Sequence, residues 1–318
     1  MGMTEGYLGE PGFAAGAMAG TQRRGSEVLV RQMGEWDLDR IMGLRTVVRW
    51  SADPDAFGLL RGMRDARWAV ADAGGCEGDI VGMVGAVPLG EVGVLCHLAV
   101  HDSYRRAGIG GRLAWWAVSY LRSRGAGVIR LDSTEAAEGL YLSMGFEQVL
   151  RRTVYRIEDA ATARGVREKG AYEISTLTIG DLPEVYGVDR WSFGGDRSAL
   201  ILAAIRLHPG RGLVARDASG RIKGYLVRSV SGGVTRIGPL LAECDSAARA
   251  LLGAALRAVS DSGGGPVEIT CASPNEEEHR LLRGCGFEGA PDRLRMELGA
   301  APESRGIPQY GTTPYLAT

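Results

Sequence analysis

The segment from Arg105 to Gly111 reads Arg-Arg-Ala-Gly-Ile-Gly-Gly and has the clearest chemical pattern in the chain. Its glycines let backbone N–H groups approach a ligand, because no Cβ stands in the way. A helical pattern starts at Ile109, and the first N–H groups of a helix lack intrahelical acceptors and lie at the positive end of its dipole. With Arg106 and Arg112 adding charge, the segment predicts an anion site, above all for a phosphate.

Two common phosphate loops do not match this segment. It has no Gly-Lys-Ser/Thr, as a Walker A loop requires, and its glycine spacing and the order of strands differ from those of a Rossmann fingerprint. An ordinary tight turn is the alternative interpretation of the glycines. A strand before the loop and a long helix after it favour the ligand site.

The elements that position this loop follow from hydrophobic periodicity. A strand-like run, Val92–His101, precedes it, and apolar residues at spacings of three and four predict an amphipathic helix over Ile109–Arg124. The other runs in this half predict strands at Val28–Met33, Trp68–Ala73, Ile80–Val87, Val128–Leu131 and Gln148–Ile157, and helices at Asp37–Arg45, Pro54–Met63 and Glu135–Ser143. That order predicts an α/β fold, of the α+β type with a mixed sheet.

The amino-acid composition argues against several classes of protein. The 318 residues carry 37 Lys+Arg against 38 Asp+Glu, a net charge of −1, so we expect no DNA partner and no membrane partner. The chain has no apolar run of transmembrane length. Five cysteines without a Cys-x-x-Cys pair predict neither a disulfide framework nor a zinc site, and we expect no metal and a cytoplasmic location.

The chain repeats itself at an offset of about 141 to 145 residues. Asp72-Ala73 and Asp217-Ala218 each end a strand-like run before a glycine turn, and Gly145-Phe146 and Gly286-Phe287 each follow a short helical stretch. We therefore expect a duplicated domain. The predicted parts are a flexible leader (1–25), a first domain (26–158), a linker (159–171), a second domain (172–299) and a C-terminal tail (300–318), for which we expect coil.

The first half resembles the GNAT (GCN-related N-acetyltransferase) superfamily. The matching residues are Leu98-Ala99-Val100, the RRAGIG loop, the LDSTEAAEGLY segment and the Tyr141 to Phe146 ending, in the order and spacing of the family. The resemblance covers roughly residues 26–157. Residues 172–298 look like a second, degenerate domain of the same type, as in bacterial tandem GNAT acetyltransferases, so the resemblance implies tandem GNAT-like acyl-CoA N-acyltransferase domains.

The resemblance implies roles for single residues. The backbone of Leu98, Ala99 and Val100 would pair with the pantetheine amides of acetyl-CoA, and Tyr141 would protonate the departing CoA thiolate. A positioned acid typically contributes about 10²–10⁴-fold in rate; the alternative for Tyr141 is a half-buried core aromatic. The pyrophosphate would be held by Arg105, Arg106, Ala107, Gly108, Ile109, Gly110 and Gly111.

The acceptor side is where the sequence departs from the family pattern. Many relatives place a Glu or His on the strand before the loop, whereas the face expected to meet the substrate here carries Val94 and Cys96. His97 would serve only if the strand bulges, and a structural histidine is the alternative, so we expect the amine to lose its proton through water. The further substrate-contact candidates are Trp50, Cys96, Asp132 and Glu135, although Trp50 also fits a core position and Glu135 a helix cap.

The second repeat lacks the residues that the first repeat is expected to use for binding CoA and for catalysis. Its corresponding loop has no glycine-rich turn and carries Glu243 and Asp245, and Leu282 stands at the position of Tyr141. We therefore predict that the second domain does not bind CoA and instead shapes the acceptor pocket or supplies a packing surface.

The sequence thus predicts an N-acetyltransferase that joins the acetyl group of acetyl-CoA to a primary amine by direct attack. We expect a small-molecule amine acceptor and a monomer or homodimer. One alternative is a longer acyl-CoA, a carrier protein or an aminoacyl-tRNA as donor. The other is a CoA-binding module without turnover.

Overall fold

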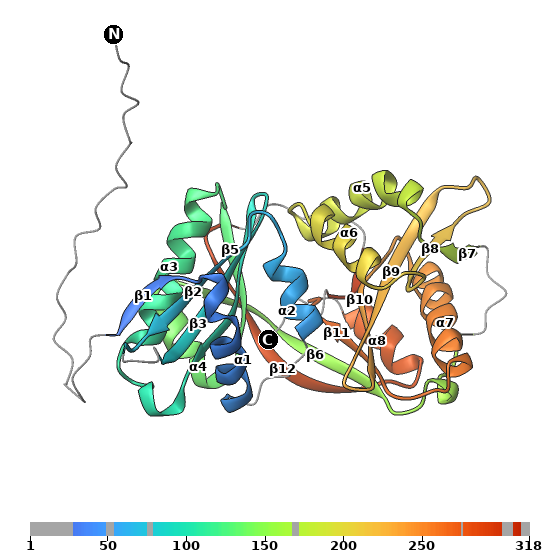
Figure 1. The fold of residues 1–318 in the computed structure, drawn as a ribbon. Coiled ribbons are helices and arrows are strands. Elements are labelled where there is room, and N and C mark those ends of the chain that lie inside the picture. Colours follow the sequence, from blue (N-terminus) through green and yellow to red (C-terminus); the bar gives the residue numbers. More distant parts are fainter. Residues whose placement is uncertain are drawn as a thin grey trace, which may run out of the picture.

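The computed structural model describes residues 28–48, 54–74, 79–166, 172–274, 276–300 and 308–312 (Figure 1). The first repeat contains the elements β1 (Leu29–Gln32), η1 (Glu35–Asp37), α1 (Leu38–Val47), α2 (Pro54–Arg61), β2 (Arg67–Asp72), β3 (Ile80–Leu89), β4 (Val92–Val100), η2 (Asp102–Tyr104), α3 (Ile109–Ser123), β5 (Val128–Ser133), α4 (Glu135–Ser143) and β6 (Glu147–Ile157). This alternation is the expected mixed α/β fold.

The second repeat follows η3 (Ala160–Thr162) and has the same order of elements. It contains β7 (Glu173–Thr176), η4 (Ile179–Asp181), α5 (Leu182–Phe193), α6 (Ser198–Leu207), β8 (Gly212–Arg216), β9 (Ile222–Ser231), β10 (Val234–Ala242), α7 (Asp245–Asp261), β11 (Val267–Cys271), α8 (Glu276–Gly284), β12 (Glu288–Leu298) and β13 (Gln309–Gly311). The two repeats lie side by side, with β6 and β12 crossing the centre (Figure 1).

The repeats share strands at this centre. The described strands form one sheet in the order β1-β2-β3-β4-β5-β12-β6-β11-β10-β9-β8-β7, with β13 paired to β10. The last long strand of the second repeat, β12, pairs with β5 of the first repeat, while β6 of the first repeat pairs with β11 of the second. Each repeat therefore completes its sheet with a strand from the other; the sequence boundary between the two domains stays a prediction.

Two groups of helices cover the two faces of the first repeat's sheet and bury its apolar residues. In the first repeat, α3 packs with its buried residues Leu113, Ala117 and Leu121 against β2, β3 and β4. On the other face, α1 and α2 share one hydrophobic core with α5 and α6 of the second repeat, so that Phe57 and Leu200 belong to the same buried cluster. This common core holds the two repeats together above the first repeat's sheet.

The C-terminal tail was expected to be coil, and that expectation is wrong for Gln309–Gly311. This segment is β13, which pairs antiparallel with β10, and the N–H of Thr312 donates to the carbonyl of Thr270 on β11 at 2.7 Å. No local sequence pattern predicts this strand, because three residues are too few to show a periodicity. The strand forms because β10 and β11 offer backbone partners. The predicted leader (1–25) and Trp50 lie outside the described residues.

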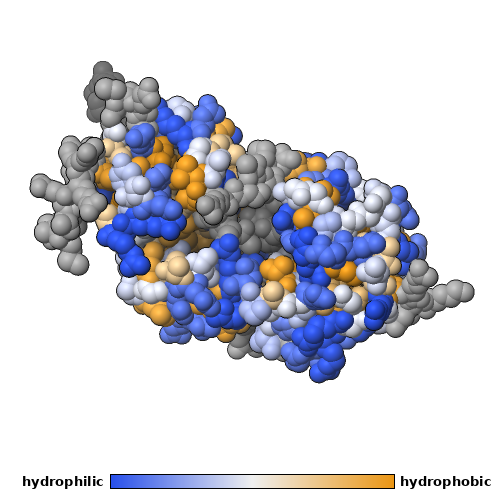
Figure 2. All heavy atoms as spheres, turned by 90° about the horizontal axis from the view of Figure 1, so that it is seen from below, coloured by the Kyte–Doolittle hydropathy of each residue, from blue (hydrophilic) through white to orange (hydrophobic). Residues whose placement is uncertain are grey.

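The surface carries polar and apolar residues intermixed. On the face shown in Figure 2, hydrophobic residues form small groups separated by hydrophilic ones over both lobes. None of the described helices combines the length and the apolar character needed to cross a membrane.

Candidate active site

Strands β4 and β5 open into a fork. They pair in parallel only from Val92 to Val94 on β4 and from Val128 to Arg130 on β5, although both strands continue beyond this point. On its other edge, β4 bulges against β3, where His97 has a φ of +53°, a conformation that a residue with a Cβ rarely adopts. The bulge re-aims the second half of β4 and leaves its backbone toward β5 open to another partner.

The glycine loop lies just beyond the end of β4. Gly108 stands in the left-handed region, with a φ of +76°, and is the N-cap of α3, and no side chain of Gly108 caps the first N–H groups of that helix. A Cβ on Gly110 would lie 3.6 Å from Leu140 and 3.8 Å from Val100. The loop therefore packs against both the end of β4 and the residue that precedes Tyr141 on α4.

The arginines of the loop differ in the hydrogen bonds and ion pairs that their side chains make. Arg105 is paired with Asp102 at 2.7 Å, and its Nε donates to the carbonyl of Val100 at 3.3 Å. Arg106 is exposed and has a φ of +63°. The charge of Arg105 is thus partly neutralised, whereas exposed Arg112, whose Nη1 donates to the carbonyl of Val28 at 2.8 Å, keeps its charge near the helix N-terminus, as Arg106 does.

Tyr141 is buried on α4, with 5% of its surface exposed. Its ring packs edge-to-face on Phe146 at 5.6 Å, in a turn that Gly145 closes with a φ of +87°. Burial raises the pKa of the Tyr141 phenol above its ordinary value, although the nearby charge of Arg293 acts in the opposite direction. The phenol therefore keeps its proton at neutral pH and can serve as a donor.

Neither Cys96 nor His97 is suited to act as a base. Burial raises the pKa of the Cys96 thiol to about 12. The guanidinium of Arg45 lies 2.9 Å from Nδ1 of His97; because an arginine can only donate, Nδ1 accepts and Nε2 carries the proton. The His97 ring also packs edge-to-face on Trp68 at 5.3 Å, an arrangement typical of a structural histidine.

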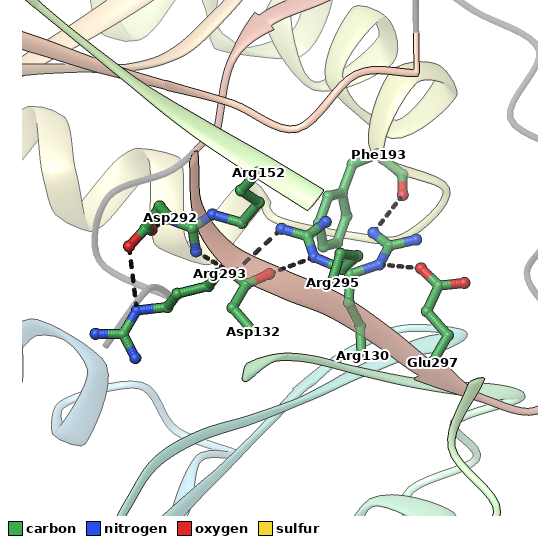
Figure 3. Close-up of polar contacts among 8 residues, drawn as sticks. All are labelled: Arg130, Asp132, Arg152, Phe193, Asp292, Arg293, Arg295 and Glu297. Carbon is green, nitrogen blue, oxygen red and sulfur yellow. Dashed lines mark hydrogen bonds and ion pairs between the residues drawn. The ribbon is translucent and has the colours of Figure 1, made fainter. Parts of the chain in front are cut away.

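Asp132 and Glu135, the two carboxylates predicted from the sequence to contact the substrate, lie in different surroundings. Asp132 lies on β5 with 9% of its side chain exposed, and it accepts hydrogen bonds from Arg152 of β6 and Arg295 of β12 (Figure 3). Burial alone would raise the pKa of Asp132, but these guanidinium groups outweigh it and lower the pKa to about 2. Glu135 is exposed in the first turn of α4, where it pairs with Arg151 at 2.9 Å. Asp132 thus faces the interior of the molecule and Glu135 faces solvent.

Several contacts of this region could not be assigned from the sequence, because the second repeat supplies the partners. Arg130 pairs with Glu297 at 2.6 Å, and its guanidinium lies 5.2 Å from the ring of Phe193. On the same ring, at 4.3 Å, lies the guanidinium of Arg197. The only sequence signal was the alternation of Arg293, Arg295 and Glu297 along a strand, which places charges on one face where core residues are expected.

A small cavity of about 30 Å³ lies between the fork and the second repeat. By volume it has room for about one or two water molecules. Its lining combines the fork, α5, the following loop, β12 and the C-terminal segment, and consists of Val94, Arg130, Leu131, Asp132, Phe193, Arg197, Arg295, Gln309 and Thr312. The cavity is therefore polar, and residues of both repeats surround it.

The corresponding fork of the second repeat is filled. Strands β10 and β11 pair in parallel from Thr235 to Ile237 on β10, and β13 then pairs with β10 at Leu240 and Leu241. Leu282, at the position of Tyr141, is fully buried. The acid predicted to repel a phosphate, Glu243, is paired with Lys223 at 2.8 Å. The described part of the chain contains no group of three or more residues able to hold a metal ion.

Comparisons with known proteins agree with this duplication. A model described as the acetyltransferase (GNAT) family matches residues 38–146, and one described as an acetyltransferase (GNAT) domain matches residues 185–311. The mycothiol acetyltransferase of Clavibacter sepedonicus is 26% identical over 235 residues, which are 69% of this chain and 77% of the relative.

Solved structures share the fold over nearly the whole chain. A protein of Pyrococcus horikoshii described as an acetyltransferase has a TM-score of 0.72 and 20% identity, with 92% of this chain and 96% of that chain covered. A tandem GNAT protein from the clavulanic acid biosynthesis pathway has a TM-score of 0.65 and 17% identity, with 87% of this chain and 100% of that chain covered.

Proposed function

Because the chain belongs to the GNAT acetyltransferases and carries two of their domains in tandem, we propose that its first repeat transfers the acetyl group of acetyl-CoA to a primary amine. The single observation that carries this proposal is the meeting of three features at one fork. The loop that begins at Gly108 packs on Val100, at the end of the open half of β4, and on Leu140, the neighbour of Tyr141 in α4, and we infer that the phenol of Tyr141 reaches the same gap.

The coenzyme would bind along the fork. The backbone of Leu98, Ala99 and Val100 would pair with the pantetheine amides as an added strand, since β5 does not occupy this part of β4. The amides from Ala107 to Gly111, with Arg105 and Arg106, would hold the diphosphate at the N-terminus of α3. Several N–H groups must act together, because a single dipole contribution is worth only about 0.3–1 kcal/mol when exposed.

The reaction proceeds in one direct displacement. The nitrogen lone pair of the amine attacks the thioester carbonyl carbon, and a backbone N–H of the bulged part of β4 stabilises the developing oxyanion. The C–S bond then breaks, and Tyr141 donates its proton to the sulfur, which leaves as the CoA thiol. The amine loses its own proton to water, because Val94, Cys96 and His97 offer no free base, and solvent returns a proton to the phenolate of Tyr141.

The acceptor would enter from the side of the cavity lined by both repeats. A cleft enclosed by a second domain suits a small amine better than a lysine on a protein surface, and the name of the curated relative, a mycothiol acetyltransferase, also favours a small-molecule acceptor. The second repeat would bind no coenzyme, since β13 fills its fork. A longer acyl-CoA, a carrier protein or an aminoacyl-tRNA remains the alternative donor.

Titration calorimetry with acetyl-CoA, combined with a thiol-release assay on a panel of amines, tests the proposal. We expect one acetyl-CoA per chain and release of CoA that depends on the amine. Binding without release on any amine would support a CoA-binding module instead, and two coenzymes per chain would contradict the role given to the second repeat.

A further inference from the structure

The cavity beside the fork lies on the face of the sheet where we expect the acceptor. Val94 and Phe193 both line it, and both belong to the buried cluster that α1, α2, α5 and α6 form over this face. Val94 pairs with Arg130 at the last step of the parallel ladder, immediately before β4 and β5 separate. The cavity therefore begins where the fork opens, within reach of a substituent on an amine bound there.

The charges that line the cavity are already balanced. Its arginines are Arg130, Arg197 and Arg295, and each has a carboxylate oxygen at 2.6 Å, from Glu297, Asp189 and Asp132 respectively. A charged group on a ligand would have to compete with one of these largely buried pairs, and breaking such a pair is costly. An uncharged group leaves all of them intact, so the cavity favours a neutral substituent.

The one hydroxyl among the lining residues has no partner. Thr312 is 8% exposed, and its Oγ1 makes no hydrogen bond to any residue that the structure describes. A buried hydroxyl normally finds a partner, and it can donate one hydrogen bond and accept others. Thr312 therefore offers both kinds of hydrogen bond that a second hydroxyl group can make.

The second repeat holds Thr312 in place. Its N–H donates to the carbonyl of Thr270 on β11 at 2.7 Å, and the nearby Tyr310, which is buried, donates its hydroxyl hydrogen to Asp245 at 2.6 Å. Gln309, which also lines the cavity, donates from Nε2 to the carbonyl of Gly311 at 3.2 Å. The hydroxyl thus stands on anchored backbone, as a recognition group must.

The size of the cavity narrows the class of substituent further. Its volume of about 30 Å³ matches one or two water molecules. A single hydroxyl fits this space, whereas a bulkier neutral group such as a carboxamide does not. A hydroxyl also takes the place of a water molecule and reproduces its hydrogen bonds, which preserves affinity.

We propose that the acceptor amine also carries an uncharged hydroxyl group, which enters this cavity and forms a hydrogen bond with Thr312. The inference rests on the proposed function and adds the substrate class, a hydroxylated amine. Thr312 is then a specificity-determining residue that the second repeat supplies to the site of the first. The second repeat thereby selects the acceptor.

Two matched series of amines test the proposal on the wild-type chain in a thiol-release assay. The amino alcohols from aminopropanol to aminohexanol carry a terminal hydroxyl, and the alkylamines from butylamine to heptylamine have a methyl group in its place. At the length that spans fork and cavity, we expect kcat/KM to be at least 10-fold higher for the amino alcohol, because the methyl group leaves Thr312 without a partner. Acceptors found in a metabolite extract with isotope-labelled acetyl-CoA are compared with their deoxy analogues in the same way.

Variants at Thr312 assign the preference to this residue. Thr312→Val keeps the shape and removes the hydroxyl, so the KM for the amino alcohol should rise about 10-fold and the two series should then agree within about twofold. Thr312→Ser keeps a hydroxyl and should retain the preference within about threefold. Thr176→Val, at an exposed position on β7, is the matched control, and the affinity for acetyl-CoA should stay within about twofold in all three variants.

Thermal unfolding of the free protein gives a readout that does not depend on turnover. The Tm of Thr312→Val should equal or exceed that of the wild type, because valine replaces a buried hydroxyl that has no partner. A lower Tm would show that Oγ1 serves the fold and would overturn the inference.

The kinetic outcomes separate the two proposals. Equal rates in both series at every length, a preference that survives Thr312→Val, or an equal loss on both series in that variant would overturn this inference and leave the acetyltransferase proposal standing. Absence of acetyl-CoA binding, or of any product from the two series and the extract, would contradict the proposed function itself.

Discussion

Arg295 and Asp132 are 163 residues apart in the chain, yet the Nε of Arg295 donates to Oδ1 of Asp132 at 2.6 Å. The two strands that carry them, β12 and β5, are neighbours, and Arg295 is registered directly opposite Asp132. A strand of the second repeat thus sets the charge state of a carboxylate in the first. This ion pair lies at the wall of the cavity and ties its shape to the exchange of strands.

Replacing Asp132 by asparagine should destabilise the fold by about 3–5 kcal/mol. The variant leaves the side chain of Arg152, which is 2% exposed, without a full countercharge in the interior. Urea unfolding followed by circular dichroism measures the change. Asp65→Asn, in the exposed pair with Arg124, is the control and should cost less than about 1 kcal/mol; equal losses in both variants would contradict the importance of burial.

The same carboxylate should make stability depend on pH in the acid range. Its pKa is about 2 in the folded protein against an ordinary 3.8, so the unfolded chain binds the proton at a higher pH than the folded one. The contribution is complete above about pH 4 and is lost as the pH falls toward 2. Urea midpoints between pH 5 and pH 2 should fall less steeply in Asp132→Asn than in the wild type; parallel curves would show that Asp132 is not the group responsible.

Gly110→Glu should abolish binding of acetyl-CoA while the protein stays folded. A Cβ at this position meets only ordinary contacts, but a carboxylate there would repel the diphosphate and cover the amides of the loop. Calorimetry measures the affinity, and thermal unfolding confirms the fold. Gly43→Glu, on the exposed face of α1 with no atom within 4 Å of the new Cβ, should bind normally. Undiminished affinity in Gly110→Glu would place the coenzyme elsewhere.

Tyr141→Phe should lower kcat by about 10²–10⁴-fold and change the affinity for acetyl-CoA by no more than about threefold. The reason is that the phenol acts only when the thiolate leaves. Pre-steady-state thiol release measures the step. Tyr120→Phe is the control, since that hydroxyl only donates to the carbonyl of Asp65 on the surface. Full activity in Tyr141→Phe would remove the residue from the mechanism.

The pH profile offers an independent check on Tyr141. Burial raises the pKa of its phenol above the ordinary value of 10, so the acid form should persist through the alkaline range. We expect kcat to show no loss attributable to Tyr141 between pH 7 and pH 10 in wild-type protein. A fall in kcat in that range that disappears in Tyr141→Phe would contradict the raised pKa.

Local sequence patterns were enough to predict much of the secondary structure of the first repeat. The helix over Glu135–Ser143 has the predicted bounds, and the helix after the glycine loop ends one residue before the predicted Arg124. These elements depend on periodicity and end signals within a few residues, which the sequence shows directly. The GNAT family and the tandem arrangement could also be predicted, because the loop motif and the repeat are short-range patterns.

The acceptor side could not be predicted in the same way. The bulge at His97, the strand at Gln309–Gly311 and the ring of arginines around Asp132 all depend on partners more than 10 residues away in the chain. A strand of three residues has no periodicity of its own, and an arginine such as Arg295 shows no preference for a partner until packing supplies one. The sequence by itself therefore determined most of the elements, the glycine loop and the duplication. Only the tertiary structure decided the exchange of β6 and β12, which brings charges of one repeat to the cavity of the other. Strand pairing between distant segments depends on the burial of whole sheet faces, and no local pattern shows it.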